Sequence, residues 1–226
     1  MTDPQFNLAD IRYAILGTAV TAFMEHIPLN KTSFVLEAGA GSGKLGTSIA
    51  VHYGSNVTLL DIDEGYLLNA ERLVHAVESI LMKRIAVSLI KGDFNALEFR
   101  DDMFDLVFSE GCIEHFPIDD VRRLKCIQEM VRVSRDWVAI ITNDAEGERT
   151  RKRAEETHHT YESMPEKETP YTREELFKNM LQAGLHSVAV TKYEDPGTQE
   201  YLLGVARKRE ELPQEYVKAP WTVRKQ

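Results

Sequence analysis

The sequence predicts an α/β protein built on a doubly wound, mostly parallel sheet with helices on both faces. Short apolar runs alternate along the chain with longer segments whose apolar residues recur at helical spacing. The apolar runs are continuous rather than alternating, which is typical of strands that helices cover on both faces. An alternation of strand and helix gives parallel strands joined by right-handed crossovers, so we expect this layered architecture for most of the chain.

The first two thirds of the chain supply the elements of this alternation. Apolar residues at 6–27 lie near helical spacing and predict one or two helices ahead of the main fold. The strands expected after them are 33–38, 56–62, 85–90, 104–109 and 137–142, and the helices between them are 44–53, 64–83 and 119–133. Asp119 or Asp120 is expected to cap the last of these helices.

The alternation is interrupted after the fifth strand. Residues 143–170 are polar and dense in charge, and a connection of this length inside a compact domain is typical of a lid or a substrate loop. A helix capped by Thr172 and two strands at 186–193 and 201–207 complete the fold. We therefore expect one domain over 1–207, with a helical cap at 1–30 and a tail over 208–226.

Composition excludes several classes of protein. The chain has 226 residues and a net charge of −9, which argues against nucleic acid or an anionic membrane as a partner. Its only two cysteines, Cys112 and Cys126, form no CxxC pair. This argues against a disulfide framework in the protein and indicates a reducing compartment. The sequence shows no secretory signal and no membrane span, so we expect a cytoplasmic monomer or homodimer.

A glycine-rich turn, VLEAGAGSGKLG at 35–46, joins the first strand to its helix. Glycines permit a tight turn and a close backbone approach to a ligand at a helix N-terminus. A P-loop is excluded because Leu45 follows Gly43 and Lys44 where Ser or Thr is required. The dinucleotide fingerprint also fails, because Lys44 stands where its third glycine belongs. This spacing disfavours a nicotinamide-dependent oxidoreductase.

The pattern that fits is ExGxGxG, and it resembles the cofactor turn of class I S-adenosylmethionine-dependent methyltransferases. Three further motifs follow in the order of that family: VTLLDIDEGYLLNA, LIKGDFNALEF and FDLVFSEGCIEHF. The resemblance covers about 32–207. It implies a seven-stranded sheet of order 3-2-1-4-5-7-6 with the last strand antiparallel. It also implies S-adenosyl-L-methionine as the cofactor and S-adenosyl-L-homocysteine as its product.

The resemblance assigns cofactor contacts motif by motif. From the glycine turn it implies Glu37, Gly39, Ala40, Gly41, Gly43 and Lys44. From the later motifs it implies ribose contacts from Asp61, adenine contacts from Ile62, Asp93 and Phe94, and contacts near the acceptor from Ser109 and Glu110. A carboxylate such as Asp61 can accept hydrogen bonds from two hydroxyl groups at once. Asp63 competes with Asp61 for this role but fits better as a helix cap.

Methyl transfer from a sulfonium is an in-line displacement, so the protein orients the reactants and in some cases supplies a base. His115 and Glu110 are the candidates for this catalytic work. Alternatively, His115 packs under the substrate loop, and Glu110 bonds to the backbone of its own turn. Glu114 is expected to face helix ends or solvent. The acceptor is expected to meet His115 and three tyrosines: Tyr13, Tyr161 and Tyr171.

The adjacent His158 and His159 suggest a metal site, but neighbours on a helix point in different directions and no ligand spacing such as HxxxH accompanies them. We therefore expect no metal. A small-molecule methyl acceptor is the favoured substrate. The alternatives are a non-catalytic protein that binds S-adenosylmethionine as a sensor or inactive partner, and a methyltransferase that acts on protein or RNA.

Overall fold

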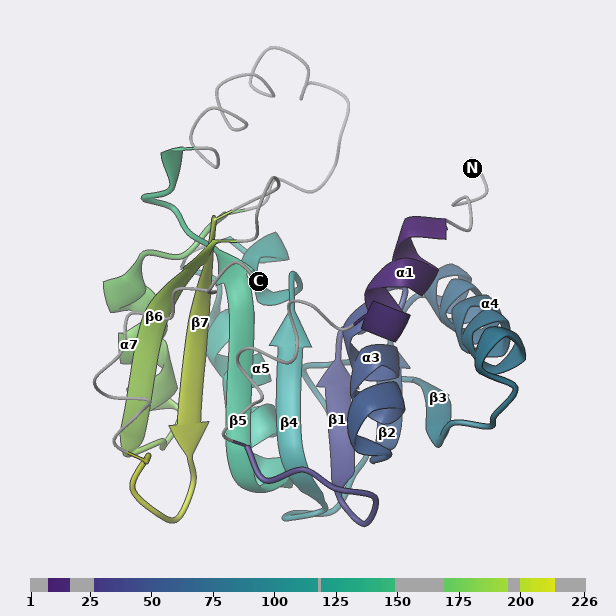
Figure 1. Cartoon of the computed structure of the whole chain (residues 1–226). Helices are drawn as coiled ribbons and strands as arrows, with labels where there is room; N and C mark the ends of the chain where they lie inside the picture. Colours follow the sequence, from purple (N-terminus) through teal and green to yellow (C-terminus); the bar gives the residue numbers. More distant parts are fainter. Residues whose placement is uncertain (1–7, 17–26, 118, 149–168, 195–199, 214–226) are drawn as a thin grey trace.

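The computed structural model describes residues 8–16, 27–117, 119–148, 169–194 and 200–213. These residues form a seven-stranded sheet of order β3-β2-β1-β4-β5-β7-β6 (Figure 1). The strands are β1 (Phe34–Ala38), β2 (Asn56–Asp61), β3 (Val87–Lys91), β4 (Phe104–Glu110), β5 (Ser134–Asn143), β6 (Ser187–Glu194) and β7 (Glu200–Arg207). β7 is antiparallel to both β5 and β6, whereas the other pairs are parallel. The predicted fold class and strand order are confirmed.

Helices cover the two faces of the sheet. Figure 1 shows α1 (Leu8–Leu16), α3 (Lys44–Tyr53) and α4 (Glu64–Leu81) on one face, and α5 (Val121–Val133) and α7 (Arg173–Gln182) on the other. Every strand except β3 contributes to both cores, because successive side chains point to opposite faces. Val35 packs in the core on the α3 face and Leu36 in the core on the α5 face. This arrangement explains why the strands are continuously apolar.

Side chains at the helix N-termini agree with the predicted caps. Asp63 accepts hydrogen bonds from the amides of Gly65 and Tyr66 at 2.6 and 3.1 Å and so caps α4. Asp120 caps α5, and Thr172 forms a reciprocal capping box with Glu175 at the start of α7. Each cap satisfies amide groups that have no partner within the helix.

The structure corrects the predicted bounds of β5 and of the segment that follows it. β5 begins at Ser134 because this residue pairs with Phe104 across an irregularity in the register with β4. β5 also extends through Asn143, and Asp144 forms a bridge with Tyr171. The chain on either side of the predicted insertion therefore returns to the same edge of the sheet.

The predicted tail from residue 208 also begins as packed structure. The Lys208 amide donates to the Asp136 carbonyl at 2.7 Å, and Leu212 is buried against the core on the α3 face. The Leu212 amide donates to Ser187 Oγ at 2.8 Å, which joins this segment to the start of β6. The segment 208–213 is thus attached to the sheet.

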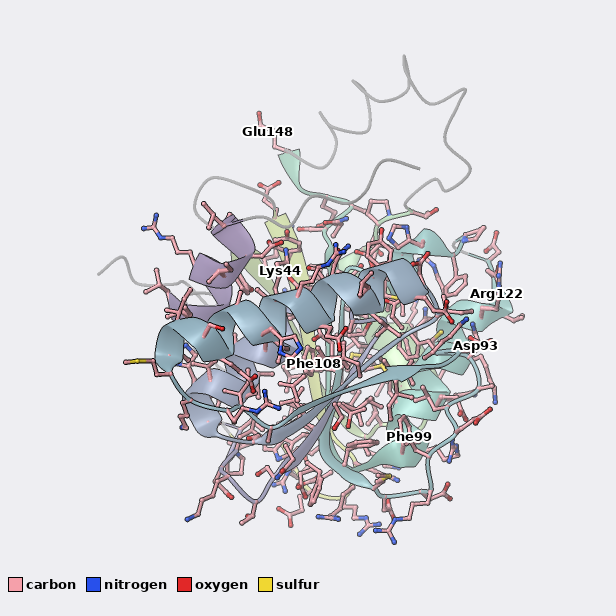
Figure 2. The ribbon with its side chains drawn as sticks, turned by 90° about the vertical axis from the view of Figure 1, so that its right-hand side faces the viewer. Lys44, Asp93, Phe99, Phe108, Arg122 and Glu148 are labelled. Atoms are coloured by element: carbon pink, nitrogen blue, oxygen red, sulfur yellow. The ribbon has the colours of Figure 1, made fainter. Side chains whose placement is uncertain are left out.

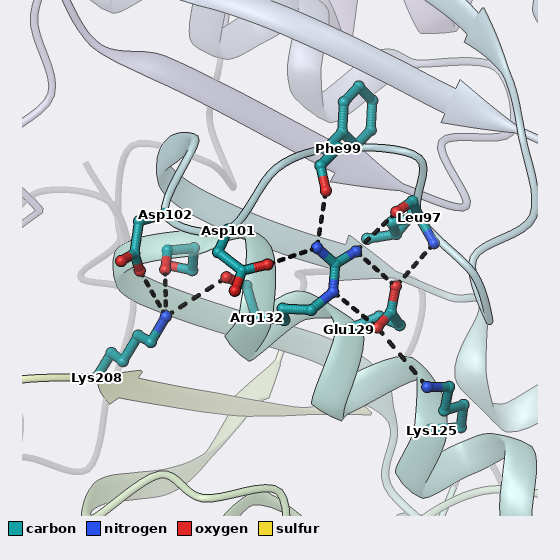
Figure 3. A network of polar contacts seen from close by, with 9 residues as sticks. Leu97, Phe99, Asp101, Asp102, Lys125, Glu129, Arg132 and Lys208 are labelled. Atoms are coloured by element: carbon teal, nitrogen blue, oxygen red, sulfur yellow. Dashed lines mark hydrogen bonds and ion pairs between the residues drawn. The ribbon is translucent and has the colours of Figure 1, made fainter.

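A polar network around Arg132 fixes the connection between β3 and β4 (Figure 3). The Arg132 guanidinium donates to the carbonyls of Leu97 and Phe99, each at 2.7 Å, and to the Glu129 carboxylate. Glu129 in turn accepts a hydrogen bond of 2.9 Å from the Leu97 amide. Hydrogen bonds to charged groups are stronger than neutral ones, so the network holds this connection firmly against α5.

Among the described residues, no helix is long and apolar enough to cross a bilayer.

Candidate functional site

The glycine turn connects β1 to α3 and opens at its middle glycine. Gly39, Gly41 and Gly43 all have positive φ, at 73°, 53° and 69°. The amides of Gly39 and Ala40 both donate to the Leu60 carbonyl at 2.9 Å, so the turn is tied to β2. A Cβ atom on Gly41 would meet no atom within 4 Å, whereas one on Gly39 would lie 2.3 Å from Cys112 Sγ. Open space therefore lies beside Gly41.

Three carboxylates occupy the carboxyl ends of neighbouring strands on the α3 face: Glu37 on β1, Asp61 on β2 and Glu110 on β4. The residue two positions before each of them packs in the core on the α3 face, and side chains two positions apart share a face. We call this group the acidic edge. Lys44, the first residue of α3, lies near Glu37 and partly offsets the negative charge.

Glu37 lies beneath the turn, 2 % exposed, and accepts a hydrogen bond of 2.9 Å from the Gly46 amide. This bond satisfies an amide in the first turn of α3, whose N-cap residue Gly43 offers no side chain. A Cβ atom on Gly46 would lie 2.6 Å from Glu37 Oε2, so a glycine is needed there. Burial, followed by repulsion from Glu110, raises the pKa of Glu37 well above its usual range.

Asp61 is held between the turn and α4. Its Oδ2 accepts a hydrogen bond of 2.8 Å from the Gly41 amide, and its Oδ1 accepts one of 2.9 Å from the Asp63 amide. A carboxylate offers about four lone pairs, so each oxygen can accept one more donor. The Asp61 carboxylate is therefore fixed beside the open space at Gly41. It can still accept one hydrogen bond at each oxygen, which matches the two hydroxyl groups of a sugar.

The predicted adenine residues lie at the ends of the adjoining strands. Asp93 follows β3, and its Oδ1 accepts bonds from the amide and the side chain of Asn95 at 2.8 and 3.1 Å. Phe94 packs in the core on the α5 face, and Ile62 is 65 % exposed directly after Asp61. Figure 2 shows Asp93 on the side of Arg122, away from Lys44. The contacts of these residues with adenine stay predictions.

The end of β4 places Ser109 and Glu110 on opposite faces. Ser109 is buried on the α5 face, and its hydroxyl has no hydrogen-bond partner among the described residues. Glu110 is half-buried on the acidic edge, and the amide of Gly111, at a φ of 63°, donates to the Ile141 carbonyl at 3.0 Å. Only the backbone of Ser109 can therefore reach the α3 face.

The structure corrects the expectation for Glu114. This residue lies in the short helix η1 (Ile113–His115) and is 1 % exposed instead of facing solvent. Its carbonyl accepts a hydrogen bond of 2.7 Å from the Thr169 amide, and desolvation raises the pKa of its side chain to about 6. The sequence alone predicts that Glu114 faces helix ends or solvent, and only the tertiary structure reveals its burial. His115, by contrast, is exposed on η1.

The predicted acceptor residues lie in different environments. Tyr13 lies on α1, with Lys44 Nζ 5.6 Å from the centre of its ring. Tyr171 is fully buried, with Arg123 over its ring and Asn179 donating to its hydroxyl at 3.3 Å, and its contact with the acceptor stays a prediction. Tyr161, His158 and His159 lie outside the described residues. Within the described ranges, no group of three or more acidic, histidine or cysteine side chains could hold a metal ion.

The fold and the glycine turn together define a Rossmann-like domain of the methyltransferase class. Residues 35–136, just under half of the chain, match the model of a family described as a methyltransferase domain. The resemblance to class I S-adenosylmethionine-dependent methyltransferases is thereby confirmed.

Solved structures with this fold cover most of the chain. Magnesium protoporphyrin IX methyltransferase from Synechocystis PCC 6803, solved with bound SAH, is 16 % identical with a TM-score of 0.64, over 91 % of this chain and 90 % of that one. A SAM-dependent methyltransferase from Thermotoga maritima, described as a possible histamine N-methyltransferase, is 17 % identical with a TM-score of 0.63, over 89 % and 92 %. These likenesses concern the fold alone.

A curated relative matches in sequence over a shorter stretch. An uncharacterized protein of Haemophilus influenzae is 27 % identical over 110 residues, which is 49 % of this chain. The match spans 41 % of that relative's length.

Proposed function

We propose that the protein is an S-adenosylmethionine-dependent methyltransferase that moves a methyl group to a small-molecule acceptor by in-line displacement. The observation that supports this most is the bond between the Gly41 amide and Asp61 Oδ2, beside the open side of the glycine turn. This bond joins Asp61, the carboxylate proposed to bind the ribose, to Gly41, a glycine whose backbone a ligand can approach closely. Both lie at the carboxyl ends of β1 and β2, where parallel α/β sheets bind their ligands.

The charge of the site fits this cofactor. S-adenosylmethionine supplies a methyl group activated by a positive sulfonium, and its amino group is also positive at neutral pH. The acidic edge places Asp61 and Glu110, and also Glu37 once a bound cation favours its ionised form, against the single ammonium group of Lys44. A site of negative charge attracts a cationic ligand, so this site favours S-adenosylmethionine over an anionic dinucleotide.

Residues of the chain take distinct roles in this proposal. Asp61 holds the ribose, and Asp93 and the Phe94 amide receive the adenine. His115 is the candidate base, because a neutral imidazole can accept the acceptor's proton and its side chain is exposed on η1. Glu110, at the end of β4, would orient the acceptor or the methyl donor. An acceptor that is already neutral and nucleophilic would need no base.

A small molecule is the favoured acceptor because the net charge of −9 opposes the binding of nucleic acid. Cys112 and Cys126 form no disulfide, which fits the reducing cytoplasm. Binding of RNA that weakens steeply with added salt would instead support an RNA methyltransferase.

Calorimetric titration with S-adenosylhomocysteine, beside NAD as a control, tests the proposal. We expect micromolar binding of the first and none of the second. Failure to bind S-adenosylhomocysteine would contradict the proposal. If it binds, His115→Ala and Glu110→Ala separate an enzyme from a sensor: a sensor keeps its function in vivo with either change but loses it with Asp61→Ala.

A further inference from the structure

A buried cluster of polar side chains lies beneath η1, where β4 and β5 end. Its members are Glu114 on η1, Arg123 on α5 and Tyr171 ahead of α7, each at most 1 % exposed. None of them contacts the cofactor in the proposed function. Burying two ionisable side chains in one place is costly unless hydrogen bonds or ion pairs replace the hydration that each loses.

The cluster holds the backbone of Thr169 from both sides. The Thr169 amide donates to the Glu114 carbonyl at 2.7 Å, and Arg123 Nη2 donates to the Thr169 carbonyl. Arg123 Nε also donates to the Phe116 carbonyl at 2.8 Å, at the end of η1. Arg123 and Glu114 therefore attach Thr169 to η1, which also contains His115.

Tyr171 extends this attachment to β5. Its amide donates to the Asn143 carbonyl at 3.1 Å, and its carbonyl accepts from the Ala145 amide at 2.8 Å. The guanidinium carbon of Arg123 lies 4.2 Å from the centre of the Tyr171 ring, a cation–π contact that is strengthened by burial. The segment 169–171 thus forms a fixed wall between η1 and the end of β5.

The carboxyl group of Glu114 is poorly matched as an anion. Its Oε1 accepts one long bond, of 3.4 Å, from the Asn143 amide, while Oε2 has no hydrogen-bond partner among the described residues. Thr142 Oγ1 lies close enough to interact with this group but has no aligned partner in the described chain either. A neutral carboxyl group would gain a proton to donate, and the Thr142 hydroxyl oxygen could accept it.

The charged groups around Glu114 do not neutralise it. Arg123 on α5 donates to two carbonyls and lies over the Tyr171 ring, while its Nη1 has no hydrogen-bond partner and no ion pair joins it to Glu114 within the described residues. His115 follows on η1, and Asp144, beyond β5, pairs with Lys192 at 3.0 Å. Desolvation is the dominant cause that raises the pKa of Glu114 to about 6.

We propose that Glu114 and Arg123 are positioning residues that hold Thr169 against η1, and that the neutral form of Glu114 is the one that fits. Ionisation of Glu114 places an unpaired charge in the cluster, so η1 and the wall at 169–171 separate to hydrate it. This inference rests on the proposed function, in which His115 on η1 is the candidate base.

Amide hydrogen exchange between pH 5 and 8 tests the inference on the full chain. We expect the protection factor of the Thr169 amide to fall at least fivefold as the pH rises through about 6, the pKa of Glu114. Glu114→Gln keeps the shape and stays neutral, so its protection should not change with pH. The matched control is Glu78→Gln, a buried glutamate at the end of α4, which should keep the wild-type profile.

Two results would overturn the inference: a wild-type protection factor independent of pH, or a Glu114→Gln profile that still falls. Arg123→Lys supplies a second variant, since lysine cannot donate to both the Thr169 and Phe116 carbonyls in the same geometry. It should lower the protection of Thr169 at pH 5, and unchanged protection would remove Arg123 from the proposal.

Titration of the same samples with S-adenosylhomocysteine separates the two proposals. Binding together with a flat exchange profile rejects the positioning role and keeps the proposed function. No binding together with the pH-dependent profile rejects the proposed function, while the attachment of Thr169 to η1 stands as a property of the fold.

Discussion

Asp61 and Gly41 meet across the carboxyl ends of two neighbouring strands, where the Gly41 amide donates a hydrogen bond of 2.8 Å to Asp61 Oδ2. The other carboxylate oxygen accepts from the Asp63 amide at 2.9 Å, so the side chain is oriented before any ligand arrives. A group that is already fixed loses little conformational entropy when it binds, which increases affinity.

Asp61→Ala should weaken the binding of S-adenosylhomocysteine more than tenfold. Each hydrogen bond to a charged group contributes about 1.5–3 kcal/mol, and the substitution also releases the glycine turn. Calorimetry measures the change. Asp63→Ala is the control, because it removes the α4 cap, at a cost of about 1 kcal/mol in stability, and should leave the affinity within twofold. A loss below twofold for Asp61→Ala would reject the ribose assignment.

Gly41→Val should weaken the binding of S-adenosylhomocysteine more than tenfold. The new side chain would fill the open space beside the turn, and valine is strained at the φ of 53°. Gly184→Val is the matched control, since Gly184 also has positive φ and open space but lies after α7. Both variants should lose stability, whereas only the first should lose affinity. Equal affinity for wild type and Gly41→Val would remove the turn from the site.

The strands could be predicted because apolar runs are properties of the local sequence, whereas their order in the sheet followed only from the resemblance carried by the motifs. The start of β5 could not, since Ser134 and Arg135 are polar and only the pairing of Ser134 with Phe104 makes them a strand. The burial of Glu114 was missed for the same reason. Its environment comes from Thr169 and Asn143, which lie far along the chain.

The candidate site shows the same division between local and tertiary signals. The positive φ of Gly41 and the cap at Asp63 follow from turn and helix chemistry. Cys112 Sγ lies so close to Gly39 that a Cβ atom on Gly39 would clash with it. This closeness arises because the loops that follow β1 and β4 approach each other. A single sequence contains no spacing rule for such an approach.

The affinity for S-adenosylmethionine should rise with pH. Burial and the nearby Glu110 raise the pKa of Glu37 in the protein alone, and a cationic ligand favours the ionised carboxylate. Binding therefore releases a proton, and affinity can rise by up to about tenfold per pH unit while Glu37 is protonated.

Calorimetry of wild type and Glu37→Gln over a pH series checks this expectation. The glutamine can still accept from the Gly46 amide but cannot ionise, so its pH dependence should flatten. S-adenosylhomocysteine lacks the sulfonium charge and should show a smaller slope with wild type. A wild-type affinity that stays constant with pH would contradict the coupling.

Arg132→Met should lower the free energy of unfolding by about 3 kcal/mol, because it leaves the Glu129 carboxylate and two carbonyls without their donor. Urea denaturation measures this loss. Lys125→Met removes a more exposed ion pair with the same Glu129, at 3.7 Å, and should cost at most about 1 kcal/mol. A loss of at most about 1 kcal/mol for Arg132→Met, no larger than that of the control, would show that the network in Figure 3 does not stabilise the connection after β3.

The position of β7 constrains the order in which the protein can be assembled during synthesis. β7 lies between β5 and β6 in the sheet although it follows both in sequence. As the chain leaves the ribosome, β5 and β6 must each wait with an unpaired edge until residues 200–207 have emerged. Exposed strand edges pair readily with other chains, so aggregation during synthesis threatens this part of the molecule most. In the half of the sheet that contains the glycine turn, β1, β2 and β3 pair in the order in which they are made, and the second edge of β1 waits only for β4, the next strand along the chain.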